Sequence, residues 1–248
     1  MLLSHDLEGS GPTVVLLHSS VCDRRMWEPQ WGPLLAAGYQ VLRADFRGYG
    51  DSPVPAEPFN NAVDVRDLLD AYAVSEAILV GSSFGGRIAQ EVASRWPERV
   101  SVLALLCAAR RLHPPTADVT AFSEREDELI AARDLDAAVA LNVATFLGPK
   151  ADDATRDLVA RMQRHAFEVQ LAAPDVESRN EDYDLTAITA RTLVVNGKHD
   201  LDYFTEIADH LAATIPGARH TVLDWAGHLP SLEDPLLLNP LLLEFLAA

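Results

Sequence analysis

The chain has 248 residues, of which 48% are hydrophobic and 23% charged, a balance that suits a globular protein and excludes a disordered, collagen-like or coiled-coil chain. Its 20 lysine and arginine residues against 37 aspartate and glutamate residues give a formal charge of −17 at pH 7. Such a field repels nucleic-acid phosphates and anionic lipid headgroups. We therefore expect a small-molecule substrate, with neither nucleic acid nor membrane as a partner.

The beginning of the chain has no basic run followed by a long apolar stretch, so we expect no signal peptide. The longest nearly apolar stretch, residues 100–109, is about half the ~20 residues that a membrane helix needs. Cys22 and Cys107 are too few for a disulfide framework and are expected to be free thiols. Together these features predict a cytoplasmic protein.

Short apolar runs rich in β-branched residues alternate with longer amphipathic runs, which is typical of strands joined by crossover helices. In chain order, strands are expected at 13–18, 40–45, 77–81, 100–107, 191–196 and 219–223. Helices are expected at 61–72, 84–96 and 202–214 and after Asp234, with Pro240 bending the last one. The predicted fold class is α/β, with a mainly parallel sheet flanked by helices.

The alternation stops in residues 112–184, an acidic, alanine-rich and helix-like stretch that opens near two adjacent prolines and contains no strand candidate. Seven basic residues stand against sixteen acidic ones there. We predict that 112–184 is a helical cap inserted into a core made of 1–111 and 185–248. The acidic side chains are either solvated helix faces or a field that disfavours strongly anionic substrates.

The most informative segment is a predicted strand, a tight turn and a helix around Gly81-x-Ser83-x-Gly85. This is the pattern of a nucleophile elbow, in which a strained turn projects one serine above the sheet. The residues two before and two after that serine must lack bulk, which selects Ser83 over its neighbour Ser82. A structural glycine-serine loop is the alternative. A P-loop is excluded because no Gly-Lys-Ser/Thr follows.

A serine hydroxyl needs an adjacent base that a carboxylate holds in one tautomer. Among eight histidines, His228 lies in a loop bounded by glycine and proline after the last predicted strand, which places it at the carboxyl edge of the sheet. The predicted acid is Asp200, after the preceding strand and its turn, whereas Asp202 is expected to cap the next helix. His18 ends a strand and is expected to shape the following loop. No spacing typical of metal ligands occurs, and we expect no metal.

Acyl transfer also needs donors aimed at the developing oxyanion, each worth roughly 3 to 4 kcal/mol of transition-state stabilisation. The backbone amide of Phe84, directly after the nucleophile, is expected to be one. The second is expected from the loop after His18, where Ser20 is our choice. Trp27 and Phe84, with the cap, would roof an apolar substrate pocket over Ser83.

With these residues in view, the chain resembles the α/β-hydrolase superfamily, of the capped type that includes small esterases, enol-lactonases and carbon–carbon bond hydrolases. The motifs that carry the resemblance are Leu16-Leu-His-Ser-Ser20 with Trp27, Asp45-Phe-Arg-Gly-Tyr-Gly-Asp-Ser52, Gly197-x-x-Asp200 and Gly227-His228. The likeness implies a catalytic triad of Ser83, Asp200 and His228, oxyanion amides from Ser20 and Phe84, and structural roles for Asp45 and Arg47.

Two departures from the family pattern stand out. The glycine that usually follows the loop histidine is Ser19 here. Family members generally begin with additional strands, so residues 1–6 are expected to form only part of one, with a reduced outer edge of the sheet.

On these grounds we expect a serine hydrolase of the carboxylesterase or lactonase type, which cleaves a small ester or lactone through an acyl-enzyme on Ser83 and needs no cofactor. Substrate groups of modest size and low negative charge are favoured. With His228 as the base, activity should fall below roughly pH 6 to 7.

Three alternatives remain open. The resemblance also allows a carbon–carbon bond hydrolase or a cofactor-independent lyase or oxygenase on the same frame. A third hypothesis is a non-catalytic protein that keeps the pocket and binds a ligand without turning it over. Arg110 and Arg111 are either surface residues at the cap hinge or a grip for a substrate carboxylate.

Overall fold

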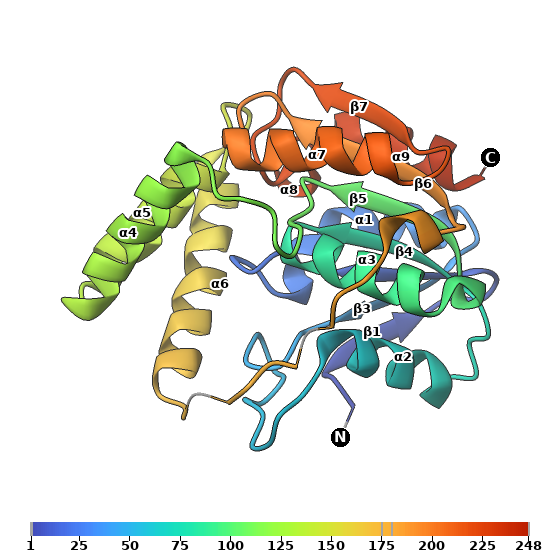
Figure 1. The fold of residues 1–248 in the computed structure, drawn as a ribbon, viewed down its shortest axis with the longest axis horizontal. Coiled ribbons are helices and arrows are strands. Elements are labelled where there is room, and N and C mark those ends of the chain that lie inside the picture. Colours follow the sequence, from blue (N-terminus) through green and yellow to red (C-terminus); the bar gives the residue numbers. More distant parts are fainter. Residues whose placement is uncertain (1, 175, 180, 248) are drawn as a thin grey trace.

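The computed structural model describes residues 2–174, 176–179 and 181–247 (Figure 1). At its centre is a seven-stranded sheet in the order β1-β3-β2-β4-β5-β6-β7. Its strands are β1 (His5–Glu8), β2 (Thr13–Leu17), β3 (Gln40–Ala44), β4 (Ala77–Ser82), β5 (Val100–Leu106), β6 (Arg191–Gly197) and β7 (Arg219–Leu223). Only β1 runs antiparallel to its neighbour, β3, and the other pairs are parallel. The predicted mainly parallel α/β sheet is confirmed.

Helices pack on both faces of this sheet. They are α1 (Glu28–Ala36), α2 (Asn61–Ala71), α3 (Phe84–Arg95), α7 (Asp202–Thr214), α8 (Pro230–Glu233) and α9 (Pro235–Ala247). One hydrophobic cluster joins the sheet to α2, α3 and α7, and a second joins its other face to α1 and α9. Residues of β2 alternate between them, since Val15 and Leu17 belong to the first cluster and Val14 and Leu16 to the second. Both faces of the sheet are therefore buried under helices, as is usual for parallel strands.

Three helices lie between β5 and β6 and project to one side of the core in Figure 1. They are α4 (Ala117–Ala131), α5 (Leu135–Phe146) and α6 (Asp153–Leu171), and the described residues of 112–184 contain no strand. A small apolar cluster that includes Leu129, Val139 and Phe167 holds them together. We refer to residues 112–184 as the helical insertion.

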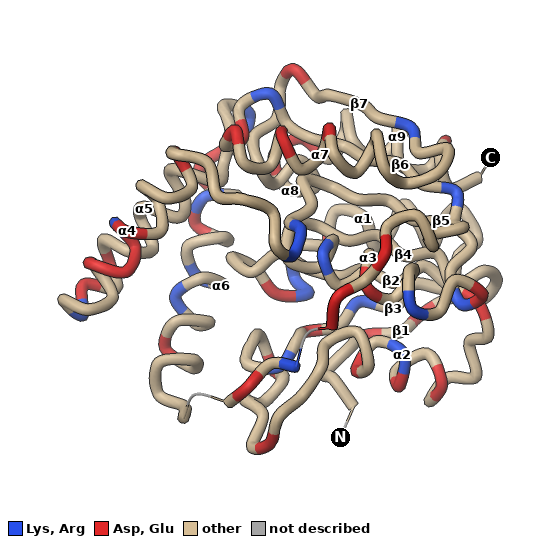
Figure 2. Tube along the Cα trace, viewed as in Figure 1, with Lys and Arg blue, Asp and Glu red and all other residues tan. Residues whose placement is uncertain are grey.

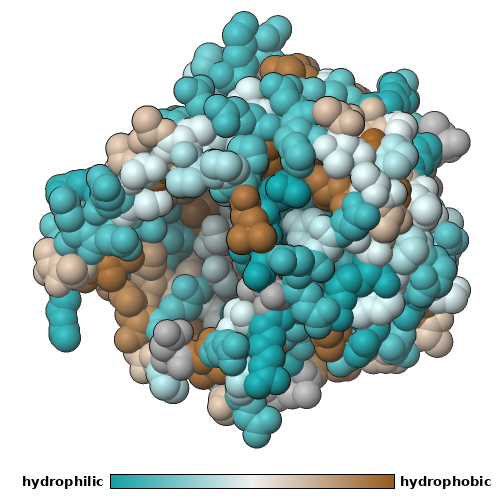
Figure 3. Space-filling model, in the orientation of Figure 1, coloured by the Kyte–Doolittle hydropathy of each residue, from teal (hydrophilic) through white to brown (hydrophobic). Residues whose placement is uncertain are grey.

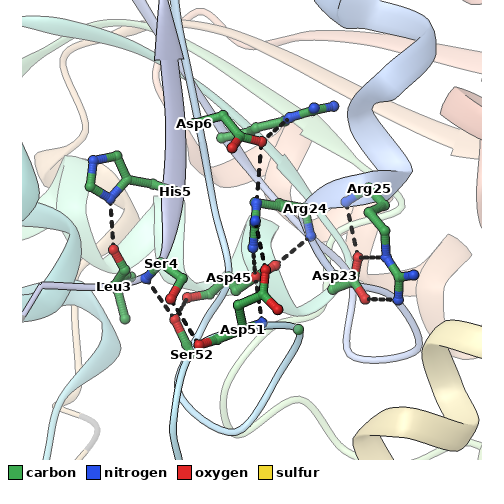
Figure 4. A network of polar contacts seen from close by, with 12 residues as sticks. Leu3, Ser4, His5, Asp6, Asp23, Arg24, Arg25, Asp45, Asp51 and Ser52 are labelled. Carbon is green, nitrogen blue, oxygen red and sulfur yellow. Dashed lines mark hydrogen bonds and ion pairs between the residues drawn. The ribbon is translucent and has the colours of Figure 1, made fainter.

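The edge of the sheet beside β1 is braced by a polar network (Figure 4). The Asp45 carboxylate accepts hydrogen bonds from the backbone amides of Arg24 at 2.7 Å and Asp51 at 2.9 Å, and it also pairs with the Arg24 guanidinium. That guanidinium reaches Asp6 on β1 and Asp51 as well. The loops after β2 and β3 are thereby joined to β1, and Asp45 has the structural place that the resemblance implied.

No helix within the described ranges has the length and apolar character needed to cross a bilayer.

Candidate active site

Ser83 occupies the turn between β4 and α3 with φ 49° and ψ −112°, a conformation that costs energy for any residue other than glycine. Backbone hydrogen bonds hold the turn in place. The Ser83 amide donates to the Leu106 carbonyl at 2.9 Å, and its carbonyl accepts from the amides of Arg87 at 3.1 Å and Ala109 at 3.0 Å. The strained turn is therefore fixed by its two neighbours, β5 and α3.

The two glycines of the motif are required by close approach of the backbone. A Cβ atom on Gly81 would lie 2.6 Å from the carbonyl oxygen of Gly85. A Cβ atom on Gly85 would lie 2.7 Å from the carbonyl oxygen of His18 and nearer still to that of Leu17. These distances agree with the expectation that side chains two residues from the elbow serine must lack bulk.

The structure brings Asp200 and His228 together. His228 Nδ1 lies 2.7 Å from Asp200 Oδ2, while Asp200 Oδ1 accepts a hydrogen bond from the Leu201 amide at 2.8 Å. The His228 side chain is 1% exposed and the Asp200 side chain is 0% exposed. With Nδ1 facing a carboxylate, the proton of a neutral imidazole belongs on Nδ1, and Nε2 is left as the basic nitrogen.

The imidazole of His228 contacts two aromatic rings. The ring centre of Phe204 is 4.0 Å away and that of Phe146 is 4.9 Å away. The backbone amide of His228 also donates to the Phe146 carbonyl at 3.1 Å. These contacts keep water away from the Asp200–His228 pair and restrict the rotation of the ring.

Glu233 is a residue of this site that sequence reasoning missed. Its carboxylate is buried and accepts hydrogen bonds from the amides of Gly227 at 2.8 Å and Leu229 at 3.0 Å, the two neighbours of His228. Burial raises the pKa of Glu233, although these amide donors oppose the shift. Its position just after the histidine loop was the available signal, but a glutamate beside an aspartate resembles ordinary surface sequence.

His18 is fully buried beside the elbow. Its Nε2 accepts a hydrogen bond from the Phe46 amide at 2.9 Å, so the proton is on Nδ1, which donates to the Ser19 carbonyl at 2.8 Å. Burial lowers the pKa of His18. The His18 carbonyl in turn accepts from the Gly85 amide at 3.0 Å. His18 therefore joins its own loop to the elbow, which agrees with the expected shaping role.

Both predicted oxyanion residues border this junction. Ser20 follows the His18–Ser19 turn and is exposed, whereas Phe84 is the first residue of α3. Within the described ranges, neither backbone amide donates a hydrogen bond. Two such amides are what an oxyanion hole requires, and the positive end of α3 lies at the same place.

The structure separates the two residues predicted to line the pocket. Phe84 lines a pocket of about 320 Å³, together with residues of the loop after β3 and the end of α6. Trp27 has 0% exposure, belongs to the core cluster that joins the sheet to α1 and α9, and lines none of the described pockets. The turn at Arg24–Trp27 directs the indole inward, which corrects the expectation that Trp27 roofs the substrate.

A second correction concerns Asp202. It is the first residue of α7 rather than its cap, which is Leu201. The Asp202 amide donates to Asp118, at the start of α4. Asp202 is exposed, and of these two candidates for the triad acid only Asp200 contacts His228.

Among the described residues, one group of potential metal ligands includes this pair. The ligand atoms of Cys107, Asp200 and His228 lie within 4.8 Å of one another. Burial raises the pKa of the Cys107 thiol well above its usual range, and a neutral thiol is a poor ligand. Asp200 moreover occupies Nδ1 of His228. The geometry fits an acid–base pair better than a metal centre, and both Cys22 and Cys107 are free thiols, as expected.

Comparison with known proteins identifies the family of the chain. A family model described as the alpha/beta hydrolase family matches residues 14–240. The 2-hydroxy-6-oxo-6-phenylhexa-2,4-dienoate hydrolase of Burkholderia cepacia is 30% identical over 264 residues, which cover 96% of this chain and 89% of that protein.

Solved structures of similar proteins share the fold over nearly the whole chain. A hydrolase from Pseudomonas aeruginosa is 30% identical with a TM-score of 0.81, covering 99% of this chain and 94% of the other. The enol-lactonase of Burkholderia xenovorans is 25% identical with a TM-score of 0.79, covering 99% and 96%. The chain therefore belongs to the alpha/beta hydrolase family and is an enzyme of that superfamily.

Proposed function

We propose that the protein is a serine hydrolase that cleaves a small ester or lactone through an acyl-enzyme on Ser83. The observation that carries the proposal is the buried hydrogen bond between His228 and Asp200 at the edge of the sheet where the strained Ser83 turn lies. Because β4, β5 and β6 are parallel neighbours, their carboxyl ends share one edge, with Ser83 after β4 and Asp200 after β6.

The reaction then follows from the role of each group. Ser83 Oγ attacks the carbonyl carbon while its proton passes to Nε2 of His228, and Asp200 stabilises the imidazolium. The amides of Phe84 and Ser20 stabilise the oxyanion. The leaving alcohol takes the proton from Nε2, and water repeats the sequence to release the acid and free Ser83. A lactone gives one hydroxy acid instead of two products.

The surroundings favour a substrate of modest size. The face drawn in Figure 3 is hollowed between the helical insertion and the core, and apolar residues line part of that hollow. We infer that the insertion acts as a cap, which is supported by the contact between Phe146, at the end of its α5, and His228. A cap of this kind excludes water from the acyl-enzyme and limits the size of the acyl group.

Two variants test the nucleophile. Ser83→Ala should abolish both hydrolysis of p-nitrophenyl butyrate and covalent labelling by a fluorophosphonate. Ser82→Ala is the matched control, since Ser82 is the neighbouring buried serine on β4 and should keep both. Labelling that persists in Ser83→Ala and disappears in Ser82→Ala would refute the assignment.

Carbon–carbon bond hydrolysis is the second candidate, favoured by the 30% identity to a dienoate hydrolase. The triad serves both reactions. A product balance separates them, because ester cleavage releases an acid and an alcohol while cleavage beside a ketone releases no alcohol. Equal amounts of acid and alcohol from an ester, or a single hydroxy acid from a lactone, would support the first candidate.

A further inference from the structure

Arg87 lies one helical turn after the proposed nucleophile. Its amide donates to the Ser83 carbonyl at 3.1 Å, and its guanidinium carbon lies 4.7 Å from the centre of the Phe84 ring. Arg87 and Phe84 line the same pocket of about 320 Å³. The Arg87 cation therefore lies against the ring of Phe84, the residue whose amide is expected to stabilise the oxyanion.

Within the described part of the chain, the Arg87 guanidinium has no hydrogen bond and no ion pair. Its close contact is the Phe84 ring, and Tyr183, Glu91 and Tyr49 act on it only through space. Glu91 attracts the guanidinium through space, but its carboxylate is bonded to other groups. Glu91, one turn further along α3, pairs with Arg95 at 2.7 Å and accepts from Asn60 at 2.9 Å.

The other arginine of the pocket shows the contrast. Arg47 is held by two hydrogen bonds to the Asp64 carboxylate, at 2.7 and 2.6 Å. Figure 2 shows basic positions beside the start of α3, whereas acidic positions predominate along α4 and α5. In a chain of charge −17, a half-buried guanidinium that forms no ion pair with a described carboxylate is unusual. Burial also lowers the pKa of Arg87, which an anion in the pocket would reverse.

We propose that Arg87 binds a carboxylate carried by the substrate, so that the preferred substrates are esters or lactones with one free carboxylate group. This inference rests on the proposed function and defines its substrate class. A guanidinium binds a carboxylate through two parallel hydrogen bonds, and the pocket leaves its donors available. The sequence predicts substrates of low negative charge, and this inference makes that expectation specific: the substrate carries one negative charge.

Arg110 and Arg111, the earlier candidates for this role, are placed less well. Arg111 pairs with Asp182 at 3.0 Å. The Nε atom of Arg110 is buried without a hydrogen-bond partner among the described residues. Neither residue lines a described pocket, whereas Arg87 lines the one that contains Phe84.

The kinetic test uses two esters of equal chain length, mono-p-nitrophenyl adipate and p-nitrophenyl hexanoate, which differ only in a terminal carboxylate. Arg87→Met should lower kcat/KM for the adipate ester about 10- to 100-fold and change that for the hexanoate ester less than about threefold. Arg87→Lys should fall between, because it keeps the charge and loses the paired geometry. Arg125→Met, on the exposed face of α4, is the control and should resemble the unaltered protein.

A binding measurement separates this inference from the proposed function, since it needs no turnover. Calorimetry compares the binding of monomethyl adipate to Ser83→Ala and to Ser83→Ala/Arg87→Met. At least about tenfold weaker binding to the double variant supports the carboxylate site, even if no ester is hydrolysed and the proposed function fails.

Two outcomes overturn the inference. One is an equal loss for both esters in Arg87→Met, which would mean that Arg87 only supports the Phe84 ring. The other is Ser83-dependent hydrolysis with no preference for the adipate ester and equal binding by the two calorimetric variants. The proposed hydrolase would then stand without its carboxylate subsite. Thermal unfolding of each variant shows whether it is folded.

Discussion

The backbone amide of His228 donates a hydrogen bond to the carbonyl oxygen of Phe146, 3.1 Å away, so the last residue of α5 is bonded to the loop of the proposed base. Glu233 strengthens the same junction, because it accepts from the amides on both sides of His228. Gly148 of the insertion lies against the Glu233 carboxylate, since a Cβ atom on Gly148 would overlap it. The position of His228 therefore depends on the helical insertion as well as on the core.

Glu233→Gln is predicted to lower kcat about tenfold or more with little change in KM, and to reduce the free energy of unfolding by about 1 to 3 kcal/mol. The amide keeps the size of the side chain but turns one acceptor into a donor, which then faces a backbone N–H group. Steady-state kinetics and urea unfolding measure the two effects. Glu244→Gln, at an exposed glutamate of α9, is the control. A Glu233→Gln protein with normal kcat would show that this clamp does not position His228.

Asp200→Asn is predicted to lower kcat by about 10³- to 10⁴-fold while the protein remains folded, because an amide no longer favours the proton on Nδ1 of His228. The comparison is Asp202→Asn, two residues away and exposed, which should keep nearly full activity. Hydrolysis of p-nitrophenyl butyrate and thermal unfolding would be measured for both. A small loss for Asp200→Asn, or a large one for Asp202→Asn, would contradict the acid assignment.

Patterns within one segment were enough to predict most of the sheet and the elbow. Alternating apolar runs located the strands to within about two residues, and Gly81-x-Ser83-x-Gly85 identified a turn that only glycine neighbours permit. Helix α1 was missed because its sequence holds two prolines and a glycine. Pro33 leaves the Pro29 carbonyl without its helical donor, and the Asn239 side chain supplies that bond at 2.9 Å.

The remaining differences at the site also arise from tertiary contacts between distant segments. The burial of Trp27 depends on how the turn after β2 packs against α8. The role of Glu233 depends on two amides in a loop whose path was unknown. Arg87 was overlooked for a similar reason. A lone arginine in a helix is ordinary. Arg87 is notable because its guanidinium lies in a pocket beside Phe84 with no hydrogen bond or ion pair to any described residue.

The burial of His18 predicts a dependence of stability on pH. Burial, opposed by the charges of Asp45 and Asp23, lowers the pKa of His18 below the ordinary histidine value of about 6.5. Below that pH, the unfolded chain takes up a proton that the folded protein resists, so the free energy of unfolding falls as pH decreases through this window.

His18→Asn should be less stable at neutral pH, because the acceptor for the Phe46 amide is disturbed, but its stability should fall less on acidification. Urea unfolding of both proteins at about pH 7.5 and about pH 5.5 gives the two slopes. All other side chains are the same in both proteins, so their contributions cancel in the comparison. Equal slopes would show that His18 is protonated as readily in the folded protein as in the unfolded chain.

The close approach of the backbone at the elbow predicts opposite effects for two glycine-to-alanine substitutions. Gly85→Ala should destabilise the protein by more than about 2 kcal/mol and abolish activity, because its Cβ atom would overlap the carbonyl oxygens of Leu17 and His18. Gly32→Ala adds the same methyl group inside α1, where no atom lies within 4 Å, and should stabilise by about 0.5 to 1 kcal/mol. Urea unfolding and esterase assays compare the two. If Gly85→Ala proved as stable and active as Gly32→Ala, the backbone at the end of β2 would have to move to admit the new methyl group. The contact between that backbone and the elbow would then not be what positions the proposed oxyanion amides.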